Sequence, residues 1–528
     1  MDQNVNTGLN GDSSLVTRPK KMPPIPSALA NHAFIDRTSK TAYCIKDSEK
    51  DLIRAFRNHV SLLKEGGFVK DLEYVPADKF AILKRENTSQ EKHSNSAMQN
   101  MARNLFKAAA KRDASDIHIV EHEAYGEVFF RIHGDLLSIK TLSKEDTVHL
   151  FKAIYTSMTD VAEPTYKEWH PQSARIKDRK FLPDNVHSIR IQKTPVIDGQ
   201  LMVFRFLYDT ETIRIEDLGY SERLGQLDAI RLMQKRPHGL IIIAGTTGSG
   251  KSTSLKNILT GMKEDAPGKS FITIEDPPEY PMADINQIPI LVDANASKEE
   301  REHMTTRALD SVLRLDPDLI MIGEIRSKIW AELGIKAART GHQTWTTIHA
   351  SDPFGIIARL VEILDTPNAI TRIADVGILS GLICQKLIQT LCPHCKRLVS
   401  ECQEELPEGV HKRLMSLVNL DVNNMVSIKG SGCDKCYGTG VGGRTILAET
   451  VVPDHFIIEK ILAEGIGSAR RTWLSQNPNQ SIKHHALEKI KVGIVDPVAA
   501  EEVVGPLTLD DAMRDKVLDK REISELSA

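Results

Sequence analysis

The chain has 528 residues with 41% hydrophobic and 26% charged side chains, a composition typical of globular proteins, and its length predicts several domains. The net charge of −3 gives no overall field that favours nucleic acid or an anionic membrane, although it leaves room for a local basic patch. No apolar run reaches the ~18 residues of a membrane-spanning helix, the N-terminal stretch has no signal-peptide core, and the seven cysteines are an odd number. We therefore expect a cytoplasmic protein without a disulfide framework.

The first 97 residues are expected to form a flexible tail, a small module and a linker. The segment RPKKMPPIPSALA (18–30) is basic and proline-rich, as in tethers. The segment DLIRAFRNHVSLLKEGG (51–67) has apolar residues at helical spacing and ends in two glycines, which predicts a helix of a small α/β module. Residues 85–97 (RENTSQEKHSNSA) are polar and predict a linker.

Residues 98–225 are predicted to form an α+β domain. Two segments, 98–112 and 143–158, have helical periodicity, and Ser143 is a plausible N-cap of the second. Alternating apolar and polar residues predict four strands: SDIHIVEH (115–122), GEVFFRIHG (126–134), VHSIRIQKTPV (186–196) and GQLMVFRFL (199–207).

Residues 226–390 are predicted to form a parallel sheet covered by helices, because short apolar strands alternate with helical segments. These strands are LIIIAG (240–245), SFITIED (270–276), LIMIGE (319–324) and TWTTIHA (344–350). A cysteine-rich segment, 391–450, and a mostly helical region, 451–528, are expected to follow.

The strongest motif lies where the first of these strands meets a helix. The sequence GTTGSGKS (245–252) matches G-x-x-x-x-G-K-[ST], a loop whose backbone N–H groups cradle phosphates at a helix N-terminus. Lys251 is expected to reach the β- and γ-phosphates of ATP, and Ser252 to hold Mg²⁺. The expected nucleotide-binding set is Gly245, Thr246, Thr247, Gly248, Ser249, Gly250, Lys251, Ser252 and Thr253.

Carboxylates and histidines follow the later strands. ITIEDPPEYP (272–281) and RLDPDLIMIGEIR (314–326) place acidic residues at strand ends, and TGHQTWTTIHAS (340–351) supplies two histidines. Taken alone, each residue is better explained as a surface carboxylate or a structural histidine. Because they follow an intact phosphate loop in this order, we expect them at the ligand-binding ends of parallel strands.

In this order the motifs resemble those of the secretion-ATPase superfamily, in particular the assembly ATPases of type IV pili and type II secretion. TIEDPPEY resembles the Asp box, LRLDPDLIMIGEIR the Walker B stretch and TGHQTWTTIH the His box. ASDIHIVEHE and SIRIQKTPVIDGQLMVFRFL resemble parts of the family's second N-terminal domain, so the resemblance covers about residues 98–450. It implies an α/β multidomain protein with a PAS-like α+β domain, a RecA-like P-loop domain, a tetracysteine zinc insertion and a helical C-terminal part.

The resemblance also implies roles for single residues. Glu279 matches the general base or water-orienting glutamate, and Glu324 matches the Walker B glutamate that holds Mg²⁺ directly or through water. Glu275 and Asp276 would support the metal or the geometry. His349 matches the residue thought to sense the γ-phosphate, and His342 also falls on the pattern.

Two arginines, Arg190 and Arg205, match those that reach the nucleotide from the N-terminal domain as arginine fingers, either in cis or from a neighbouring subunit.

The chain departs from the family pattern at Ser327, in the HASDP sequence after the His box and at the bulky Trp345. These departures spare the residues assigned to chemistry and indicate a divergent branch, such as plasmid-borne thin pili or a conjugation-related system.

Two C-x₂-C pairs, Cys392 with Cys395 and Cys433 with Cys436, have the spacing of a four-thiolate zinc site. His394 is a weaker alternative ligand, and a redox pair is the competing interpretation. The cysteines are expected after the last strands of the parallel sheet, and the glycine-rich CYGTGVGGR (436–444) to form part of the metal knuckle. In the family, assembly and export members carry such an insertion and retraction members generally lack it.

The sequence thus predicts a hexameric ATPase that powers assembly of a type IV pilus or a type II secretion pseudopilus. The implied cofactors are ATP, Mg²⁺ and Zn²⁺, and the implied partners are an inner-membrane platform protein and the pilin assembly machinery, without direct nucleic acid. The protein would be cytoplasmic and peripheral at the inner membrane. The alternatives are a conjugative type IV secretion ATPase, a retraction motor, and a non-hydrolysing scaffold that binds nucleotide and zinc. A nucleic-acid translocase is a further alternative, which the absence of a basic excess disfavours.

Overall fold

The computed structural model describes residues 25–508 except for 26–28, 30–31, 37–38, 47, 49, 66, 161–164, 210–211, 277, 291–296 and 419–424. The predicted N-terminal tail lies almost wholly outside the described residues, as does the end of the C-terminal region. In the part of the chain that is described, no helix has both the length and the apolar character needed to cross a membrane.

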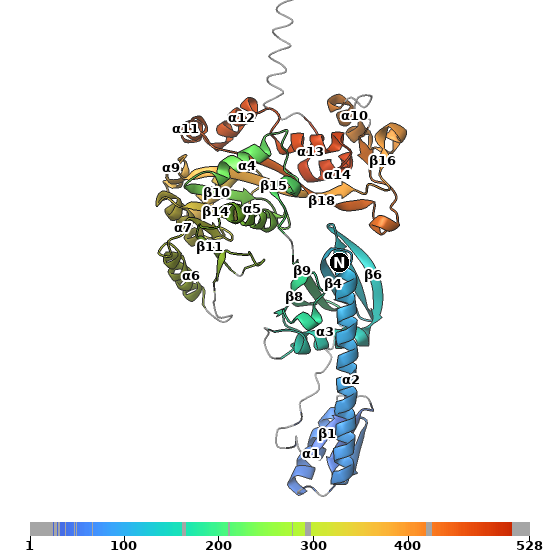
Figure 1. Cartoon of the computed structure of the whole chain (residues 1–528). Helices are drawn as coiled ribbons and strands as arrows, with labels where there is room; N and C mark the ends of the chain where they lie inside the picture. Colours follow the sequence, from blue (N-terminus) through green and yellow to red (C-terminus); the bar gives the residue numbers. More distant parts are fainter. Residues whose placement is uncertain are drawn as a thin grey trace, which may run out of the picture.

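A small α/β module lies at the bottom of Figure 1. Strand β2 pairs with β1 in antiparallel and with β3 in parallel orientation. Phe56, Val60 and Leu63 of α1 are buried at helical spacing against this sheet, and the helix ends before Gly67, whose φ is 73°. Its elements are β1 (Ala33–Asp36), β2 (Thr41–Ile45), α1 (Lys50–Glu65) and β3 (Asp71–Val75).

One long helix, α2 (Ala77–Ala110), runs from this module to the next sheet (Figure 1). It contains residues 85–97, which the sequence had predicted as a linker of turn-like composition. Asn, Ser and Lys lower helix stability by less than about 1 kcal/mol each, so polarity alone does not end a helix whose two ends are packed. Phe80 is buried in the module and Phe106 in the core of the following domain.

The second unit is a six-stranded antiparallel sheet in the order β6-β5-β4-β9-β8-β7, covered by α2 and α3. The four predicted strands are confirmed, and so is the N-cap, because Ser143 Oγ accepts a hydrogen bond from Asp146 N–H. In this sheet Arg190 of β8 pairs directly with Arg205 of β9. The elements are β4 (Ala114–Glu121), β5 (Tyr125–Ile132), β6 (Asp135–Ser143), α3 (Lys144–Ser157), β7 (Gln172–Ile176), β8 (Val186–Val196) and β9 (Gly199–Tyr208).

The third unit is a seven-stranded sheet in the order β12-β11-β13-β14-β10-β15-β18. All neighbouring strands are parallel except β15 and β18, so the predicted parallel sheet is confirmed. Its elements are α4 (Gln226–Gln234), β10 (Gly239–Ala244), α5 (Lys251–Asp265), β11 (Phe271–Glu275), β12 (Asn286–Pro289), α6 (Lys298–Val312), β13 (Leu319–Ile322), α7 (Lys328–Arg339), β14 (Gln343–Ile348), α8 (Pro353–Leu364), α9 (Ala369–Ile373), β15 (Leu379–Leu391) and β18 (Val441–Val451).

The cysteine-rich segment is an insertion between β15 and β18, whose ends pair at Leu391 and Val441. The expectation that it follows the last sheet strand was therefore wrong, because β18 returns to the sheet. The first residues of β18 belong to the glycine-rich segment 436–444, which had been assigned to the metal knuckle. The insertion and the helical C-terminal region contain β16 (Arg397–Leu398), α10 (Glu408–Leu417), β17 (Ser427–Ile428), α11 (His455–Glu464), α12 (Ile466–Gln476), α13 (Ile482–Lys491) and α14 (Pro497–Val504).

The mixed α/β architecture with C-terminal helices agrees with the predicted fold class. The domain boundaries expected at residues 97, 225, 390 and 450 stay predictions.

Candidate active site and metal centre

The phosphate loop joins the end of β10 to the start of α5, as the motif predicts. A Cβ atom on Gly245 would lie 2.3 Å from the Gln385 carbonyl oxygen, so only glycine fits at this approach. Gly248 and Gly250 have φ angles of 77° and 82°, in the left-handed region that other residues disfavour. The first N–H groups of α5 lack intrahelical partners, so the loop presents donors suited to an anion.

Lys251, His349 and Glu324 meet beside this loop. Lys251 Nζ lies 3.0 Å from the Gly245 carbonyl oxygen and 3.5 Å from His349 Nδ1. His349 Nε2 lies 2.8 Å from Glu324 Oε1. Burial lowers the pKa of the Lys251 ammonium, and the neighbouring carboxylates of Glu324 and Glu279 partly offset that shift. The histidine ring thus links the phosphate loop to the carboxylate at the end of β13.

The carboxylates after β11 occupy different environments. Glu275 is 6% exposed, and its Oε1 accepts hydrogen bonds from Thr273 Oγ1 and Gln287 Nε2 at 2.8 and 3.0 Å. These contacts fit a supporting role for Glu275. Asp276 is exposed, and Glu279 is partly exposed at the cavity wall, where it is accessible to a water or a ligand.

The opposite wall belongs to the six-stranded sheet. Arg190 Nη1 lies 3.7 Å from Glu279 Oε1, and Arg205 Nε donates to the buried Asp116 carboxylate at 2.9 Å. The other terminal nitrogen of Arg190, Nη2, is buried and has no hydrogen-bond partner among the described residues. An unpartnered guanidinium nitrogen is costly to bury, and an anionic ligand in the cleft would satisfy it.

Further contacts hold the two sheets together on one side of the cleft. Gln389 Nε2 of β15 donates to the His133 carbonyl oxygen at 3.0 Å and to Asp135 Oδ2 at 2.9 Å, at the turn between β5 and β6. The Arg112 guanidinium lies 5.2 Å from the centre of the Tyr437 ring. The six-stranded unit is thus tied to β15 and to the cysteine insertion.

The cleft forms a cavity of about 860 Å³, within the usual range for ligand pockets. The structure brings most of the predicted site residues together in it: Arg190, Arg205, Thr247, Gly248, Ser249, Gly250, Lys251, Ser252, Thr253, Glu275, Asp276, Glu279, Glu324 and His349. Gly245 contacts this group through its carbonyl oxygen, and Thr246 accepts a hydrogen bond from Lys251.

His342 does not line the cleft, so its expected role in nucleotide binding stays a prediction. Its carbonyl oxygen accepts a hydrogen bond from Gly239 N–H at the start of β10, whereas the phosphate loop follows the end of that strand. Six residues of strand, at ~3.3 Å each, separate the two ends by about 20 Å. His342 precedes β14 and His349 follows it, so the two histidines stand at opposite ends of that strand.

Sequence reasoning missed several charged residues of the cleft. Arg444 comes from β18, Arg131 from β5, and Arg326 follows Glu324, to which it donates a hydrogen bond. Arg444 stands at the end of the segment that had been assigned to the metal knuckle. A strand assignment for residues 441–451 would have directed attention to it.

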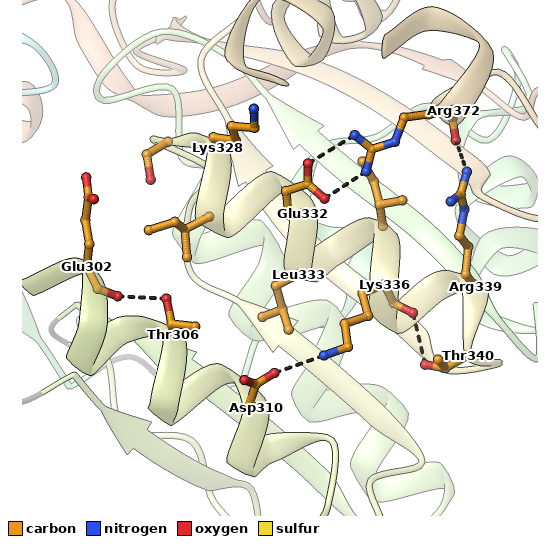
Figure 2. A pocket seen from close by; sticks show the side chains of 13 residues that line it. Glu302, Thr306, Asp310, Lys328, Glu332, Leu333, Lys336, Arg339, Thr340 and Arg372 are labelled. Atoms are coloured by element: carbon orange, nitrogen blue, oxygen red, sulfur yellow. Dashed lines mark hydrogen bonds and ion pairs between the residues drawn. The ribbon is translucent and has the colours of Figure 1, made fainter. Parts of the chain in front are cut away.

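A second cavity of about 880 Å³ lies between α6 and α7 (Figure 2). Four of its charged side chains are paired with one another: Lys336 with Asp310 at 2.9 Å, and Arg372 with Glu332 at 2.8 Å. None of the predicted site residues lines it. The phosphate-loop cleft, which holds the predicted site residues, is therefore the better candidate for an anionic substrate.

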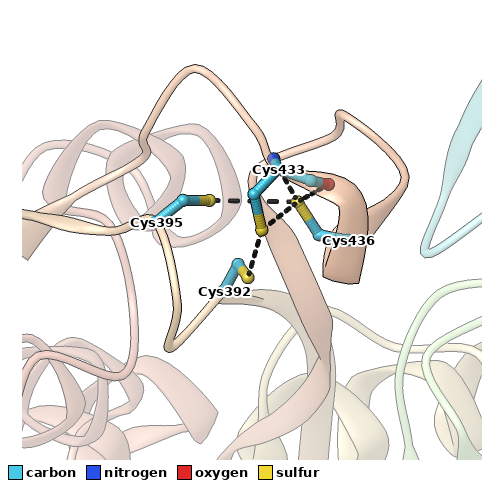
Figure 3. Close-up of side chains that lie close together, drawn as sticks. All are labelled: Cys392, Cys395, Cys433 and Cys436. Atoms are coloured by element: carbon cyan, nitrogen blue, oxygen red, sulfur yellow. Dashed lines mark hydrogen bonds between the residues drawn. The ribbon is translucent and has the colours of Figure 1, made fainter.

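The four cysteines of the insertion converge (Figure 3). Their Sγ atoms all lie within 4.8 Å of one another, and three of the distances are 3.7, 3.8 and 3.9 Å. A tetrahedral zinc site with ~2.3 Å bonds places sulfur atoms about 3.8 Å apart. His394 does not belong to this group.

The backbone around Cys436 suits a thiolate. Burial would raise the pKa of its thiol, but hydrogen bonds from the N–H groups of Cys433 and Gly440, both at 3.2 Å, and from neighbouring thiols lower that pKa to about 6. A Cβ on Gly430 would lie 1.8 Å from the Cys395 carbonyl oxygen, so the two loops approach closely only with glycine there. The donor set and its spacing fit Zn²⁺.

Comparison with known proteins agrees with this geometry. Residues 91–513 match the family model described as type II/IV secretion system protein. The chain belongs to the type II/IV secretion ATPase family.

Two relatives show how far the similarity to this family extends. The type IV pilus assembly ATPase PilB of Thermus thermophilus is 32% identical over 401 residues, which cover 76% of this chain and 42% of that protein. The type II secretion system ATPase E of Vibrio cholerae is 30% identical over 399 residues, 75% of this chain and 72% of that protein. The match thus spans less than half of the Thermus protein.

Two solved structures have a similar fold. The pilus retraction motor PilT with bound ADP superposes with a TM-score of 0.52 at 23% identity, covering 78% of this chain and 97% of PilT. The ATPase DotB of Legionella pneumophila gives a TM-score of 0.50 at 21% identity, covering 75% of this chain and 93% of DotB.

Proposed function

We propose that this chain is an ATP-hydrolysing motor that powers assembly of a type IV pilus or a type II secretion pseudopilus. The observation that carries the proposal is the cleft in which Lys251 and the carboxylates at the ends of parallel strands face Arg190 and Arg205 of another sheet. That combination suits phosphoryl transfer, which depends on positioning and on positive charge around the phosphates. The tetracysteine insertion favours assembly over retraction, as the family resemblance implies.

The residues have complementary roles in this proposal. The N–H groups of the phosphate loop and Lys251 bind the phosphates of ATP, and Ser252 and Glu324 hold Mg²⁺, which would offset phosphate charge. Glu279 orients the attacking water, and Arg190 and Arg205 stabilise charge on the transferred phosphoryl group. Since the arginines and the phosphate loop belong to different sheets, nucleotide turnover would close and open the cleft.

We further propose a homohexamer, cytoplasmic and peripheral at the inner membrane, that acts on a platform protein of that membrane and through it on the pilin assembly machinery. The first 85 residues would help to dock the motor there. The described part of this region forms the small α/β module, which lies at the opposite end of the long helix α2 from the six-stranded sheet, and this separation supports a docking role (Figure 1).

Replacing Glu279 with glutamine tests the chemistry. We expect the turnover number to fall about 100-fold, because a neutral amide cannot accept the proton of the attacking water, while ATP affinity stays close to that of the wild type. Phosphate release and ATP binding are measured separately. Asp310→Asn, a carboxylate change in the cavity between α6 and α7, serves as the control and should keep full turnover. A wild type without turnover would instead favour the non-hydrolysing scaffold.

Mixing Arg205→Ala subunits with Lys251→Ala subunits tests whether the arginine acts within its own chain. Arg205 lines the cavity of its own phosphate loop, so we expect no recovery of turnover at any mixing ratio. Each mutant subunit would then lack one part of its own site. Recovery at intermediate ratios would show that Arg205 serves a neighbouring subunit. Dilution of each variant with wild-type chain controls for subunit exchange.

A further inference from the structure

The segment that joins the six-stranded sheet to the parallel sheet is fastened to the phosphate-loop unit. Ile213 N–H donates to Asn257 Oδ1 of α5 at 2.7 Å. Lys489 Nζ of α13 donates to the Gly219 carbonyl oxygen at 2.8 Å, and Ser221 Oγ donates to Glu488 Oε2 at 2.6 Å. We call residues 212–225 the joining segment. The joining segment is thus held near its start by α5 and in its middle by α13.

Two buried side chains connect the joining segment to the phosphate loop. Tyr220 is 4% exposed, and its hydroxyl donates to Gln385 Oε1 at 2.6 Å. Gln385 on β15 is fully buried, and its Nε2 donates to the Ser249 carbonyl oxygen at 2.8 Å. Burial raises the pKa of the Tyr220 hydroxyl, which therefore keeps its proton and remains a donor. The hydrogen bonds run without a break from the joining segment to the loop.

The bond to Ser249 has a consequence for the adjacent donor. A trans peptide is planar, so its C=O and N–H groups point in opposite directions. When Gln385 holds the Ser249 carbonyl towards β15, the Gly250 N–H of the same peptide must point away from β15. A Cβ on Gly250 would lie 3.3 Å from Gln385 Nε2, so glycine gives this amide room to approach. Gln385 therefore fixes the direction of one phosphate-loop donor.

We propose that Tyr220 and Gln385 are positioning residues that set the backbone orientation of the phosphate loop and couple it to the joining segment. Neither side chain needs to touch the nucleotide. The inference deepens the proposed ATPase function and rests on it. Because the joining segment follows β9, which carries Arg205, a movement of the six-stranded sheet would reach Gly250 N–H through this connection.

The test compares Gln385→Leu and Tyr220→Phe with the wild type. For Gln385→Leu we expect Mg²⁺–ADP to bind about tenfold more weakly and the KM for ATP to rise about tenfold, the effect of one buried hydrogen bond lost. The turnover number should change less than about threefold, because the groups that act on the transferred phosphoryl group remain. Tyr220→Phe, which keeps the Gln385–Ser249 bond, should show a smaller shift in the same direction.

Gln343→Leu is the matched control. Gln343 is also buried, and its Nε2 donates to the Met233 and Gln234 carbonyl oxygens at 3.1 Å, at the start of β14 and away from the phosphate loop. Its replacement should lower thermal stability but leave nucleotide affinity unchanged. If Gln385→Leu fails to fold, hydrogen exchange of residues 245–253 in Tyr220→Phe decides. Faster exchange than in Gln343→Leu supports the coupling, and equal exchange overturns it.

The outcomes separate the two proposals. A wild type that binds no ADP overturns the proposed function, and with it the coupling. A wild type that binds ADP and a Gln385→Leu variant that binds it equally well overturn the coupling alone.

Discussion

Lys251→Ala is expected to reduce ATP turnover by about 1,000-fold or more. The ammonium is the only cation that the phosphate loop itself supplies, and it is buried against the Gly245 and Thr246 carbonyls beside Glu324 and His349. A preorganised charge in a site shielded from water stabilises transferred phosphate far more than an exposed one does. The loss should appear both in phosphate release and in ATP binding, measured with the same protein.

The fold should survive this substitution. Burying a lysine without a carboxylate in hydrogen-bond contact costs free energy, so its removal should not lower the melting temperature. Lys263→Ala is a suitable control, since Lys263 lies on the same helix and donates to the Pro267 and Lys269 carbonyls away from the cleft. Turnover retained in Lys251→Ala would refute the assignment of the phosphate loop.

Cys433→Ser is expected to release zinc and to unfold the metal knuckle that carries the four cysteines. Structural zinc contributes about 10–16 kcal/mol in small zinc-binding peptides, whereas α10 and the rest of the insertion stay packed through the buried cluster around Val399 and Leu414. Elemental analysis should find one zinc per wild-type chain purified under reducing conditions and none in the variant. Limited proteolysis should cut the variant between residues 392 and 440, with little direct effect on nucleotide binding.

Cys402→Ser is the matched control for the metal site. Its thiol is buried near the four cysteines but contacts the Leu398 carbonyl oxygen and does not belong to the group. This variant should keep its zinc. If the wild-type protein purified under reducing conditions contains no zinc, the four cysteines are not a zinc site and form only a cluster of packed thiols.

The parts predicted best from sequence are those whose signal is local. The phosphate loop can be predicted from glycines at fixed spacing between a strand and a helix. The positions of Glu324 and His349 in the site can be predicted because the carboxyl ends of parallel strands lie at one edge of the sheet. The zinc ligands follow from two short spacings, which already bring thiolates together in pairs.

The parts that were missed depend on tertiary contacts. Residues 85–97 are helical because both ends of α2 are packed, which local polarity does not reveal. Gln385 lies in a buried strand and has no motif around it. Its role follows only from the hydrogen bonds that its amide makes with Tyr220 and with the Ser249 carbonyl oxygen, which the fold brings next to it. Arg444 reaches the cleft because β18 returns to the sheet, a pairing that no local pattern indicates.

The hairpin of β15 and β18 has a consequence for the evolution of the fold. Because Leu391 and Val441 are paired neighbours, the whole cysteine insertion leaves the sheet and re-enters it at one point. A family member could gain or lose it by a single exchange of a hairpin loop, with the register of all seven strands preserved. The insertion also shares a buried core with α13 and α14, so its gain or loss would change the packing of these helices while the seven-stranded sheet keeps its register.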